Sequence, residues 1–334
     1  MTISIIICTR DRADSLRMTL QSIASAEIPA GWSAELLVVD NGSTDHTSQV
    51  LQNAVCNNLR LRHVMEPTPG QCFARNRGLK EATGDVIVFT DDDVRVPSNW
   101  IEGMCRPIAD GRCDAVAGGI VFPPHIAHRM SRPPLVLLRA WFASSDYLDP
   151  EKPVNMIGAN MAFHRRVLSK VRAFDTQLGP GALGFFDEAL FSWQMTAAGF
   201  RLKGSLDVAV EHHFDTTRLT RDSLLTLARK MGRSRAYIFH HWKQQRSRMI
   251  VPRLTWAELQ LAWARILDRN GRLAGRLPSI EVIRQEEMRA FCREYLVQRK
   301  GPARYAVSGT AEVQAEPAST VCPSPAMANG RGSR

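Results

Sequence analysis

The stretch Val86-Ile87-Val88-Phe89-Thr90-Asp91-Asp92-Asp93 joins a short apolar segment to three consecutive carboxylates. Its first five residues are mostly β-branched or aromatic, a composition that favours a strand covered on both faces. Similar apolar segments occupy residues 3–8, 36–39 and 59–65. The sequence therefore predicts a group of buried strands, one of which ends in an acidic triplet.

Segments of helical length separate these strands. Residues 15–25, 44–55 and 71–82 have helical spacing of apolar side chains, and Ser43 or Thr44 can cap the second segment. A helix at 98–109 and a strand at 115–121 continue the pattern. This alternation predicts an α/β fold, with a mostly parallel sheet and helices on its faces.

The pattern changes after residue 121, where four prolines interrupt the regular elements: Pro123, Pro124, Pro133 and Pro134. Further along we expect a strand at 156–163, a helix at 188–198 that ends at Gly199, and basic amphipathic helices after Thr220. Residues 301–334 are rich in Ala, Ser, Pro and Gly, and we expect them to form a disordered tail.

Composition excludes several classes of protein. The 334 residues are 44% hydrophobic and 23% charged, which is typical of globular chains. Residues 1–10 do not resemble a signal peptide, and no run of eighteen uncharged apolar residues occurs, so we expect a cytoplasmic chain that does not span a membrane. The seven cysteines form no Cys-x-x-Cys pair, which argues against a thiolate zinc site.

The net charge of +10 is concentrated in the C-terminal third. Residues 218–304 contain roughly twenty Lys or Arg against about seven Asp or Glu. Such a surface attracts nucleic acid, anionic lipid or a phosphorylated substrate, and a solvated helical face is the simpler interpretation. The charge alone does not distinguish among these three partners and a solvated surface.

Polar residues follow three of the predicted strands: Thr9-Arg10-Asp11, Asp40-Asn41 and Asp91-Asp92-Asp93. Because ligands of an open parallel sheet bind beyond the carboxyl ends of its strands, these residues gather at the binding edge. Clustered carboxylates raise each other's pKa unless a cation or donors compensate. Asp91 and Asp93 can bind Mg²⁺ or Mn²⁺, which can hold a diphosphate leaving group. An acidic turn or a helix cap is the alternative.

Missing motifs narrow the choice of ligand. The sequence has no G-x-G-x-x-G after the first strand and no G-x-x-x-x-G-K-[ST], which disfavours a dinucleotide cofactor and a P-loop nucleotide. A nucleotide diphosphate bound through metal remains. Asp40 can accept a hydrogen bond from the imide N–H of a uracil or thymine ring.

These motifs resemble those of family 2 glycosyltransferases, which have the GT-A fold. The matching segments are residues 4–10, 38–45, 74–78 with Gly70, and 89–93. The resemblance implies that Asp93 is the direct metal ligand, with Asp91 as its partner in the D-x-D motif. It also implies a nucleotide site formed by Thr9, Arg10, Asp11, Asp40, Asn41, Arg75, Asp91 and Asp92.

The same resemblance extends to the catalytic base. Residues 174–181, the pair Asp187-Glu188 and the dipeptide Ala198-Gly199 are similar to the family's Gly-rich loop, acidic pair and helix end, although the acidic pair is inverted. Counting back from Ala198 favours Glu188 as the base, with Asp187 as the other candidate. An acidic first turn that complements the helix dipole is the alternative.

Three further positions are candidates for the site. His212 and His213 follow a predicted strand at 208–211, where similar enzymes place a histidine that can reach the metal or diphosphate, so either can be the ligand. Asn160 lies in a segment that resembles the family's cleft and can bind a sugar hydroxyl. Trp193 can stack on a sugar, although its helical spacing is also typical of core residues.

The resemblance implies a metal-dependent, inverting hexosyl transfer from a nucleotide diphosphate donor, expected to be a UDP-sugar, to a saccharide, lipid-linked or other hydroxyl acceptor. The expected cofactor is Mn²⁺ or Mg²⁺. The basic C-terminal helices are candidates for peripheral contact with the inner membrane face, and we expect no nucleic-acid partner. The alternatives are a nucleotidyl- or phosphotransferase, and a catalytically degenerate basic interaction module.

The expected organisation is one GT-A domain at residues 1–215, followed by a helical extension at 216–300 and the tail at 301–334. Within the domain, residues 1–121 form the nucleotide-binding half and residues 122–215 the acceptor half.

Overall fold

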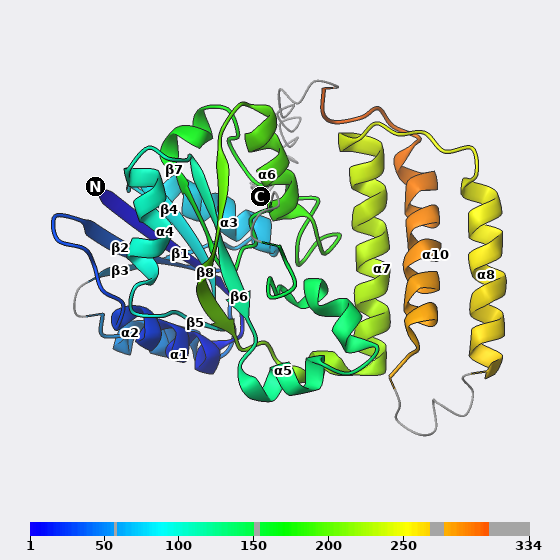
Figure 1. Ribbon diagram of the computed structural model, residues 1–334, viewed down its shortest axis with the longest axis horizontal. Coiled ribbons are helices and arrows are strands. Elements are labelled where there is room, and N and C mark those ends of the chain that lie inside the picture. Colours follow the sequence, from blue (N-terminus) through cyan, green and yellow to red (C-terminus); the bar gives the residue numbers. More distant parts are fainter. Residues whose placement is uncertain (57–58, 150–153, 268–276, 307–334) are drawn as a thin grey trace, which may run out of the picture.

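The computed structural model describes residues 1–56, 59–149, 154–267 and 277–306. Its strands are β1 (Thr2–Thr9), β2 (Ser33–Asp40), β3 (Arg60–Met65), β4 (Val86–Asp91), β5 (Val94–Arg95), β6 (Ala115–Val121), β7 (Met161–His164) and β8 (Leu202–His212). They form one sheet in the order β3-β2-β1-β4-β7-β6-β8-β5. Helices cover this sheet, and three long helices stand beside it (Figure 1).

The first four strands form the parallel part of the sheet. β1 pairs in parallel with β2 and β4, and β2 pairs in parallel with β3. Ile5, Ile6 and Ile7 are all fully buried, so both faces of β1 are covered, as expected for a parallel sheet. β7 is antiparallel to β4 and β6, and β8 is parallel to β6, which confirms the predicted mostly parallel α/β sheet.

Two layers of helices cover the sheet. The side of Ile5 and Ile7 packs against α1 (Ala13–Ala24), α2 (Thr47–Asn53) and α4 (Trp100–Ala109). The side of Ile6 packs against α3 (Gln71–Glu81) and α6 (Asp187–Ala197). Because both faces of the sheet are packed against helices, the strand ends can hold side chains in fixed positions.

Several boundaries differ from the prediction. Ser43 and Thr44 do not cap α2, which begins at Thr47, where the backbone N–H donates to the Asp45 carboxylate (3.0 Å). The strand expected at 156–163 is shorter, and the strand expected at 208–211 begins at Leu202 because β8 pairs with β6 along most of its length.

The proline-rich stretch is more regular than the sequence predicts. Pro124 begins helix α5 (Pro124–Met130), since proline lacks an N–H group that the first turn would leave unpaired in any case. A 3₁₀ helix, η1 (Leu135–Phe142), follows it. Two more 3₁₀ helices, η2 (Arg165–Ser169) and η3 (Thr216–Leu219), lie later in the chain.

The predicted basic helices are present. They are α7 (Arg221–Tyr237), which continues into the π-helix η4 (Ile238–Trp242), α8 (Ile250–Leu267) and α10 (Ile280–Gln298). We call α7, α8 and α10 the helical unit, in which α10 lies between the other two (Figure 1). None of the helices that the structure describes is long and apolar enough to cross a membrane.

The start of the predicted tail belongs to the fold. Tyr305 is buried, its ring packs against Trp242, and its hydroxyl donates a hydrogen bond to Asp175. The prediction of disorder is therefore wrong for residues 301–306, because this side chain anchors them to the loop before α6. Residues 307–334, the rest of the predicted tail, lie outside the described residues.

Candidate active site

Strand register brings the predicted acidic residues to one edge of the sheet. Thr9 lies opposite Asp40, and Asp91 lies beside Cys8, so three adjacent parallel strands end together. β5 then pairs with the end of β8, which places His212 opposite Val94. This antiparallel pairing brings a histidine from the second half of the chain to the acidic edge.

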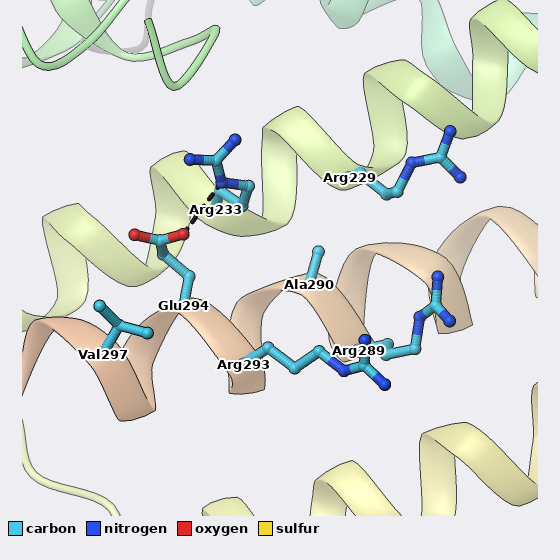
Figure 2. Close-up of a pocket in the computed structure, with 7 residues that line it drawn as sticks. All are labelled: Arg229, Arg233, Arg289, Ala290, Arg293, Glu294 and Val297. Carbon is cyan, nitrogen blue, oxygen red and sulfur yellow. Dashed lines mark hydrogen bonds and ion pairs between the residues drawn. The ribbon is translucent and has the colours of Figure 1, made fainter.

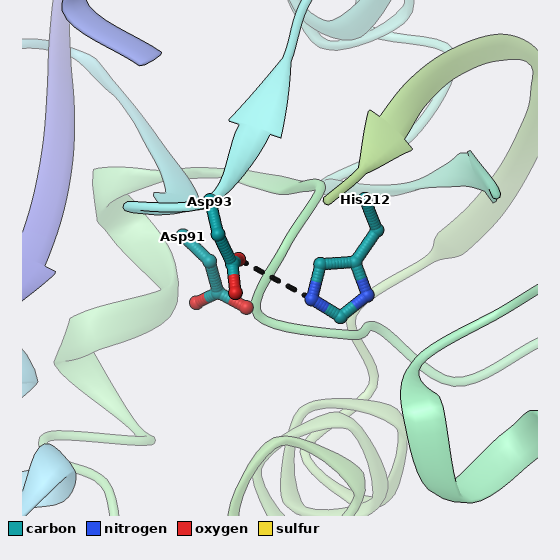
Figure 3. A group of neighbouring side chains, drawn as sticks. All are labelled: Asp91, Asp93 and His212. Atoms are coloured by element: carbon teal, nitrogen blue, oxygen red, sulfur yellow. Dashed lines mark ion pairs between the residues drawn. The ribbon is translucent and has the colours of Figure 1, made fainter. Parts of the chain in front are cut away.

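Asp91, Asp93 and His212 form a group whose ligand atoms all lie within 4.8 Å of one another (Figure 3). The Nε2 atom of His212 is 3.2 Å from Asp93 Oδ1. The opposite ring nitrogen, Nδ1, donates a hydrogen bond to the backbone carbonyl of Phe142 (2.9 Å). This bond fixes the ring, so that Nε2 faces the two carboxylates.

The donor set fits a hard divalent cation. Adjacent ligand atoms around a six-coordinate Mg²⁺ are separated by about 3 Å and opposite ones by about 4.2 Å. The separation between His212 and Asp93 matches an adjacent pair, and the limit of 4.8 Å for the group requires at most a small side-chain movement. Two carboxylates and one imidazole suit Mn²⁺ as well as Mg²⁺.

The charges at the group favour a cation between His212 and the carboxylates. Burial alone would lower the pKa of His212, but Asp93 outweighs this effect and raises it. Burial alone would raise the pKa of Asp93, but His212 and Arg12 lower it below its usual value. Because Nδ1 already carries a hydrogen, Nε2 holds either a proton or a metal ion between itself and Asp93.

Asp92 points away from this group. Its carboxylate accepts hydrogen bonds from the Thr9 hydroxyl and from Arg12 Nη1, both at 2.7 Å. The same Arg12 nitrogen lies 2.8 Å from Asp93 Oδ2. Burial raises the pKa of Asp92 to about 6 despite the nearby arginine. Arg12 therefore links Asp92, which Thr9 holds in place, to Asp93 of the metal group.

Arg75 connects the acidic edge to α6. Its guanidinium is almost fully buried and pairs with Asp187, with Glu188 Oε1 at 2.8 Å, and with Asp91 Oδ1 at 3.8 Å. A Cβ atom added to Gly158 would lie 1.9 Å from Arg75 Nη2 and 2.6 Å from Glu188 Oε1. The arginine and the glutamate thus occupy space that only a glycine leaves open.

The two acidic residues of α6 differ in exposure. The Asp187 side chain is 1% exposed, whereas that of Glu188 is 21% exposed. Burial and the neighbouring Glu188 raise the pKa of Asp187. Burial would also raise the pKa of Glu188, but Arg75 and Asp187 together more than offset this effect and lower it. Of the two residues, Glu188 is therefore the ionised carboxylate that solvent can reach.

The remaining predicted nucleotide residues form the adjoining loops. Asn41 uses its side-chain amide to accept from Gly70 N and to donate to two backbone carbonyls, and Asp11 accepts from the Thr44 backbone N–H (2.6 Å). These two side chains hold the loops in place. Asp40 is buried and accepts from Ser43 N (2.8 Å), while the exposed Arg10 pairs with Asp11 (3.7 Å).

The family model described as glycosyl transferase family 2 matches residues 4–172, about half of the chain, and this segment contains β1 to β7 and the acidic edge. The chain belongs to glycosyl transferase family 2. This match confirms the resemblance to family 2 glycosyltransferases that the motifs indicated.

Proteins similar to this family 2 chain include named glycosyltransferases. A glucosyl-dolichyl phosphate glucuronosyltransferase of Haloferax volcanii is 27% identical over 186 residues, which is 54% of this chain and 58% of the relative. The chain thus spans less than two thirds of that relative's length. The mannosyltransferase PcManGT of Pyrobaculum calidifontis, solved with GDP-Man and Mn²⁺, has a TM-score of 0.58 and 20% identity over 88% of this chain and 86% of the other.

A second solved neighbour is TarS 1–349 of S. aureus in complex with UDP-GlcNAc. It has a TM-score of 0.50 and 16% identity, and the alignment covers 90% of this chain and 93% of the other. At such identities the likeness shows the fold alone. It confirms the predicted GT-A architecture of the family 2 domain.

Three predicted site residues of the family 2 chain lie elsewhere. Asn160 is completely buried, and its amide bonds to Trp100 Nε1, Gly119 O and Val208 O, each at 2.8 Å, so a sugar hydroxyl cannot reach it. Trp193 packs against Phe186 beside the apolar core. His213 turns to Glu211 (3.1 Å), which leaves His212 as the histidine of the metal group.

Two arginines at the site have no counterpart in the sequence prediction. Arg12 pairs with Asp92 and Asp93, as described above. Arg218 is half-buried, lies over the rings of Phe142 (5.5 Å) and Phe214 (5.8 Å), and forms no ion pair with any described residue. Burial lowers the pKa of Arg218, while Asp93 and Asp91 act in the opposite direction. The Arg218 guanidinium therefore lies near the metal group and forms no direct ion pair with any described residue.

Proposed function

We propose that this family 2 chain is a metal-dependent inverting glycosyltransferase. It moves a hexosyl group from a nucleotide diphosphate donor, with a UDP-sugar as the expected donor, to a hydroxyl acceptor. One observation carries this proposal. Asp91, Asp93 and His212 converge at the carboxyl ends of the strands, and Arg75 pairs with both Asp91 of this group and the partly exposed Glu188.

The donor side supports binding of a nucleotide diphosphate. Asp91, Asp93 and His212 would hold Mn²⁺ or Mg²⁺, which when bound neutralises charge on a departing diphosphate. Arg12 and Arg218 add fixed positive charge beside this group, a second way to stabilise a leaving anion. Nucleotide-sugar complexes of the fold neighbours, GDP-Man in PcManGT and UDP-GlcNAc in TarS, support the same class of donor.

On the acceptor side, we assign the role of the base to Glu188. Its carboxylate takes the proton from the acceptor hydroxyl as that oxygen attacks the anomeric carbon, while the bond from this carbon to the diphosphate oxygen breaks. The proton ends on Glu188, and the sugar is inverted in a single displacement. Asp187 is a positioning residue, because it is buried behind Arg75 and holds its guanidinium.

A saccharide or lipid-linked acceptor fits this chemistry, since either supplies a hydroxyl group. The dolichyl phosphate in the name of the Haloferax volcanii relative supports a lipid-linked acceptor. A cytoplasmic enzyme that contacts the inner membrane face through its basic helices would meet such an acceptor at the surface of the bilayer.

The experiment measures two quantities on Glu188→Gln and Asp187→Asn. Release of nucleoside diphosphate from UDP-glucose, UDP-N-acetylglucosamine and GDP-mannose, with and without Mn²⁺, reports turnover. Thermal shift with UDP or GDP plus Mn²⁺ reports donor binding. We expect Mn²⁺-dependent release from the wild type, and unchanged nucleotide binding with about a thousandfold slower turnover for Glu188→Gln.

Other outcomes would favour a different base or a different function. Full turnover in Glu188→Gln would move the base elsewhere, with Asp187→Asn as the next variant to compare. Release of pyrophosphate or inorganic phosphate instead of a nucleoside diphosphate would indicate a nucleotidyl- or phosphotransferase. A wild type that binds no nucleotide with Mn²⁺ would support the degenerate interaction module.

A further inference from the structure

Helix α8 is apolar on two opposite sides. Its inner side packs on α10 through Ile250, Ala257 and Leu261, which are all buried. Its outer side exposes large hydrophobic side chains, each between 57% and 67% exposed: Val251, Trp256, Leu259, Trp263, Ile266 and Leu267. We call the surface formed by these six residues the α8 outer face.

No charged residue interrupts the α8 outer face. Successive helical residues turn by about 100°, which places Arg253, Glu258 and Arg265 on the flanks near α10. Glu258 pairs with Arg293 of α10, and Arg265 pairs with Glu286 of α10 (3.3 Å). The strip runs about 24 Å along the edge of the molecule, at the standard rise per residue (Figure 1). Water-exposed strips of this extent are unusual on soluble proteins.

The rest of the helical unit does not share this character. The groove between α7 and α10, with a volume of about 250 Å³, is lined by Arg229, Arg233, Arg289 and Arg293 (Figure 2). Acidic partners from within the unit hold most of these arginines, as in the pair of Arg233 with Glu294 (2.9 Å) and of Arg289 with Glu286 (2.6 Å). The groove is therefore lined by arginines that already have acidic partners, either within α10 or, as for Arg233 and Glu294, between α7 and α10.

Cations gather at the amino end of the α8 outer face. Between residues 243 and 257 the chain has four basic side chains and no acidic one. All four are exposed: Lys243, Arg246, Arg248 and Arg253. Basic side chains next to an exposed apolar strip are typical of helices that lie in the interface of an anionic membrane.

We propose that the α8 outer face docks the protein on the surface of an anionic lipid bilayer. Trp256 and Trp263 enter the interface with the aliphatic side chains, as tryptophan prefers that depth, and the basic segment contacts lipid phosphates. The charges favour this partner over a second copy of the chain, because lipid phosphates can pair with Lys243, Arg246, Arg248 and Arg253, whereas the α8 outer face of a second copy offers these side chains no acidic group. A convex strip one helix wide also fits a fluid surface better than a rigid partner.

The test uses the full chain without donor or Mn²⁺, so it does not depend on the proposed reaction. Vesicles of phosphatidylcholine, with or without phosphatidylglycerol, are sedimented with wild type, with Trp256→Gln/Trp263→Gln, and with Arg246→Gln/Arg248→Gln. Met18→Gln on α1, which is 47% exposed, is the matched control. Sedimentation equilibrium without vesicles measures self-association.

We expect the wild type and Met18→Gln to bind vesicles that contain phosphatidylglycerol, and the double tryptophan variant to bind at least about tenfold more weakly. The double arginine variant should lose the preference for anionic lipid. Brominated acyl chains should quench tryptophan fluorescence in the wild type and less in a Trp256→Phe/Trp263→Phe variant that still binds. Glu188→Gln should bind as the wild type does, even if it is inactive.

Two results would overturn the proposal. One is equal vesicle binding by the double tryptophan variant and Met18→Gln. The other is no vesicle binding by a wild-type chain that forms a dimer, with dissociation of that dimer by the tryptophan substitutions, which would assign the α8 outer face to a second copy. Folding of every variant is checked by thermal unfolding, and outward side chains should change it little.

Discussion

Acidic side chains lie at both ends of the strands of the central sheet, which we call the amino edge and the carboxyl edge. The negative charge of these side chains is compensated differently at the two edges. At the amino edge, Glu35, Asp85 and Asp114 each accept several hydrogen bonds from nearby hydroxyl, backbone N–H or guanidinium groups. These donors hold all three pKa values below their usual range. At the carboxyl edge, burial raises the pKa values of Asp91 and Asp92 instead, while His212 and Arg12 lower that of Asp93.

The difference distinguishes carboxylates that stabilise the fold from carboxylates that form a site. A carboxylate surrounded by donors gains stability from ionisation, whereas one buried among other acids loses stability until a cation arrives. The carboxyl edge keeps this unfavourable arrangement because the sheet holds its strand ends in place. The raised pKa of Asp91, in a group of side chains that also fits a metal, therefore indicates a functional site.

The strongest test of this difference between the two edges is to replace one acidic residue at each of them. Asp93→Ala should lower Mn²⁺-dependent turnover by about a thousandfold or more, since it removes a ligand of the metal group and a partner of Arg12. Asp85→Asn at the amino edge should leave turnover within about twofold and lower the melting temperature instead. Both are read by nucleoside diphosphate release and thermal unfolding. Equal loss of turnover in the two variants would mean that activity only follows folding.

A smaller but still large effect is expected where the carboxyl edge meets α6. Gly158→Ala should slow turnover by about a hundredfold, because the new methyl group displaces Arg75 and Glu188 from their contact. Gly301→Ala is the control, since a Cβ there meets nothing closer than 4.0 Å. Unchanged kcat in Gly158→Ala, measured on the same donor, would show that the position of Arg75 is not important for the reaction.

The sequence predicts the first half of the fold well, because each strand of the parallel part is a local apolar run bounded by turn residues. Strand β8 is different. Its first six residues, Leu-Lys-Gly-Ser-Leu-Asp, lack an apolar run and become a strand by pairing with β6, more than eighty residues earlier in the chain. Such pairing depends on tertiary structure, and local pattern cannot reveal it.

The candidate site divides in a similar way. Asp91, Asp93 and Arg75 lie in short motifs, so their convergence could be predicted. Asn160 could not be assigned correctly from its motif, because three partners from distant segments bury it and use its amide. Arg218 gave no signal either, since its place near the metal group depends on the fold of η3 and on the rings beneath it.

Arg218 gives an intermediate test of the carboxyl edge. Arg218→Gln should lower kcat by about ten- to a hundredfold, as it removes a fixed charge beside the proposed leaving group, while Arg218→Lys should recover part of the loss. Arg201→Gln is the matched control at the amino edge, where the exposed arginine lies 3.7 Å from Asp114. If the two glutamine variants have the same kcat, Arg218 has no part in the reaction.

The smallest expected effect concerns stability at the amino edge. Burial would raise the pKa of Glu35, but hydrogen bonds from Ser4 and Thr83, together with Arg62, lower it from 4.5 to about 2. Because the folded pKa is the lower one, ionised Glu35 stabilises the fold above pH 4.5, and this contribution is lost as the pH falls towards 2.

Glu35→Gln should therefore lower the free energy of unfolding by about 1–2 kcal/mol at pH 7, after allowance for solvent screening. Urea unfolding between pH 7 and pH 3 should show the gap between wild type and variant becoming narrower. Glu102→Gln, in an exposed pair with Arg106 on α4, should show little difference at any pH. A gap for Glu35→Gln that stays constant down to pH 3 would mean that side-chain packing, not its ionised carboxylate, stabilises this edge, and the contrast between the two edges would then not rest on charge.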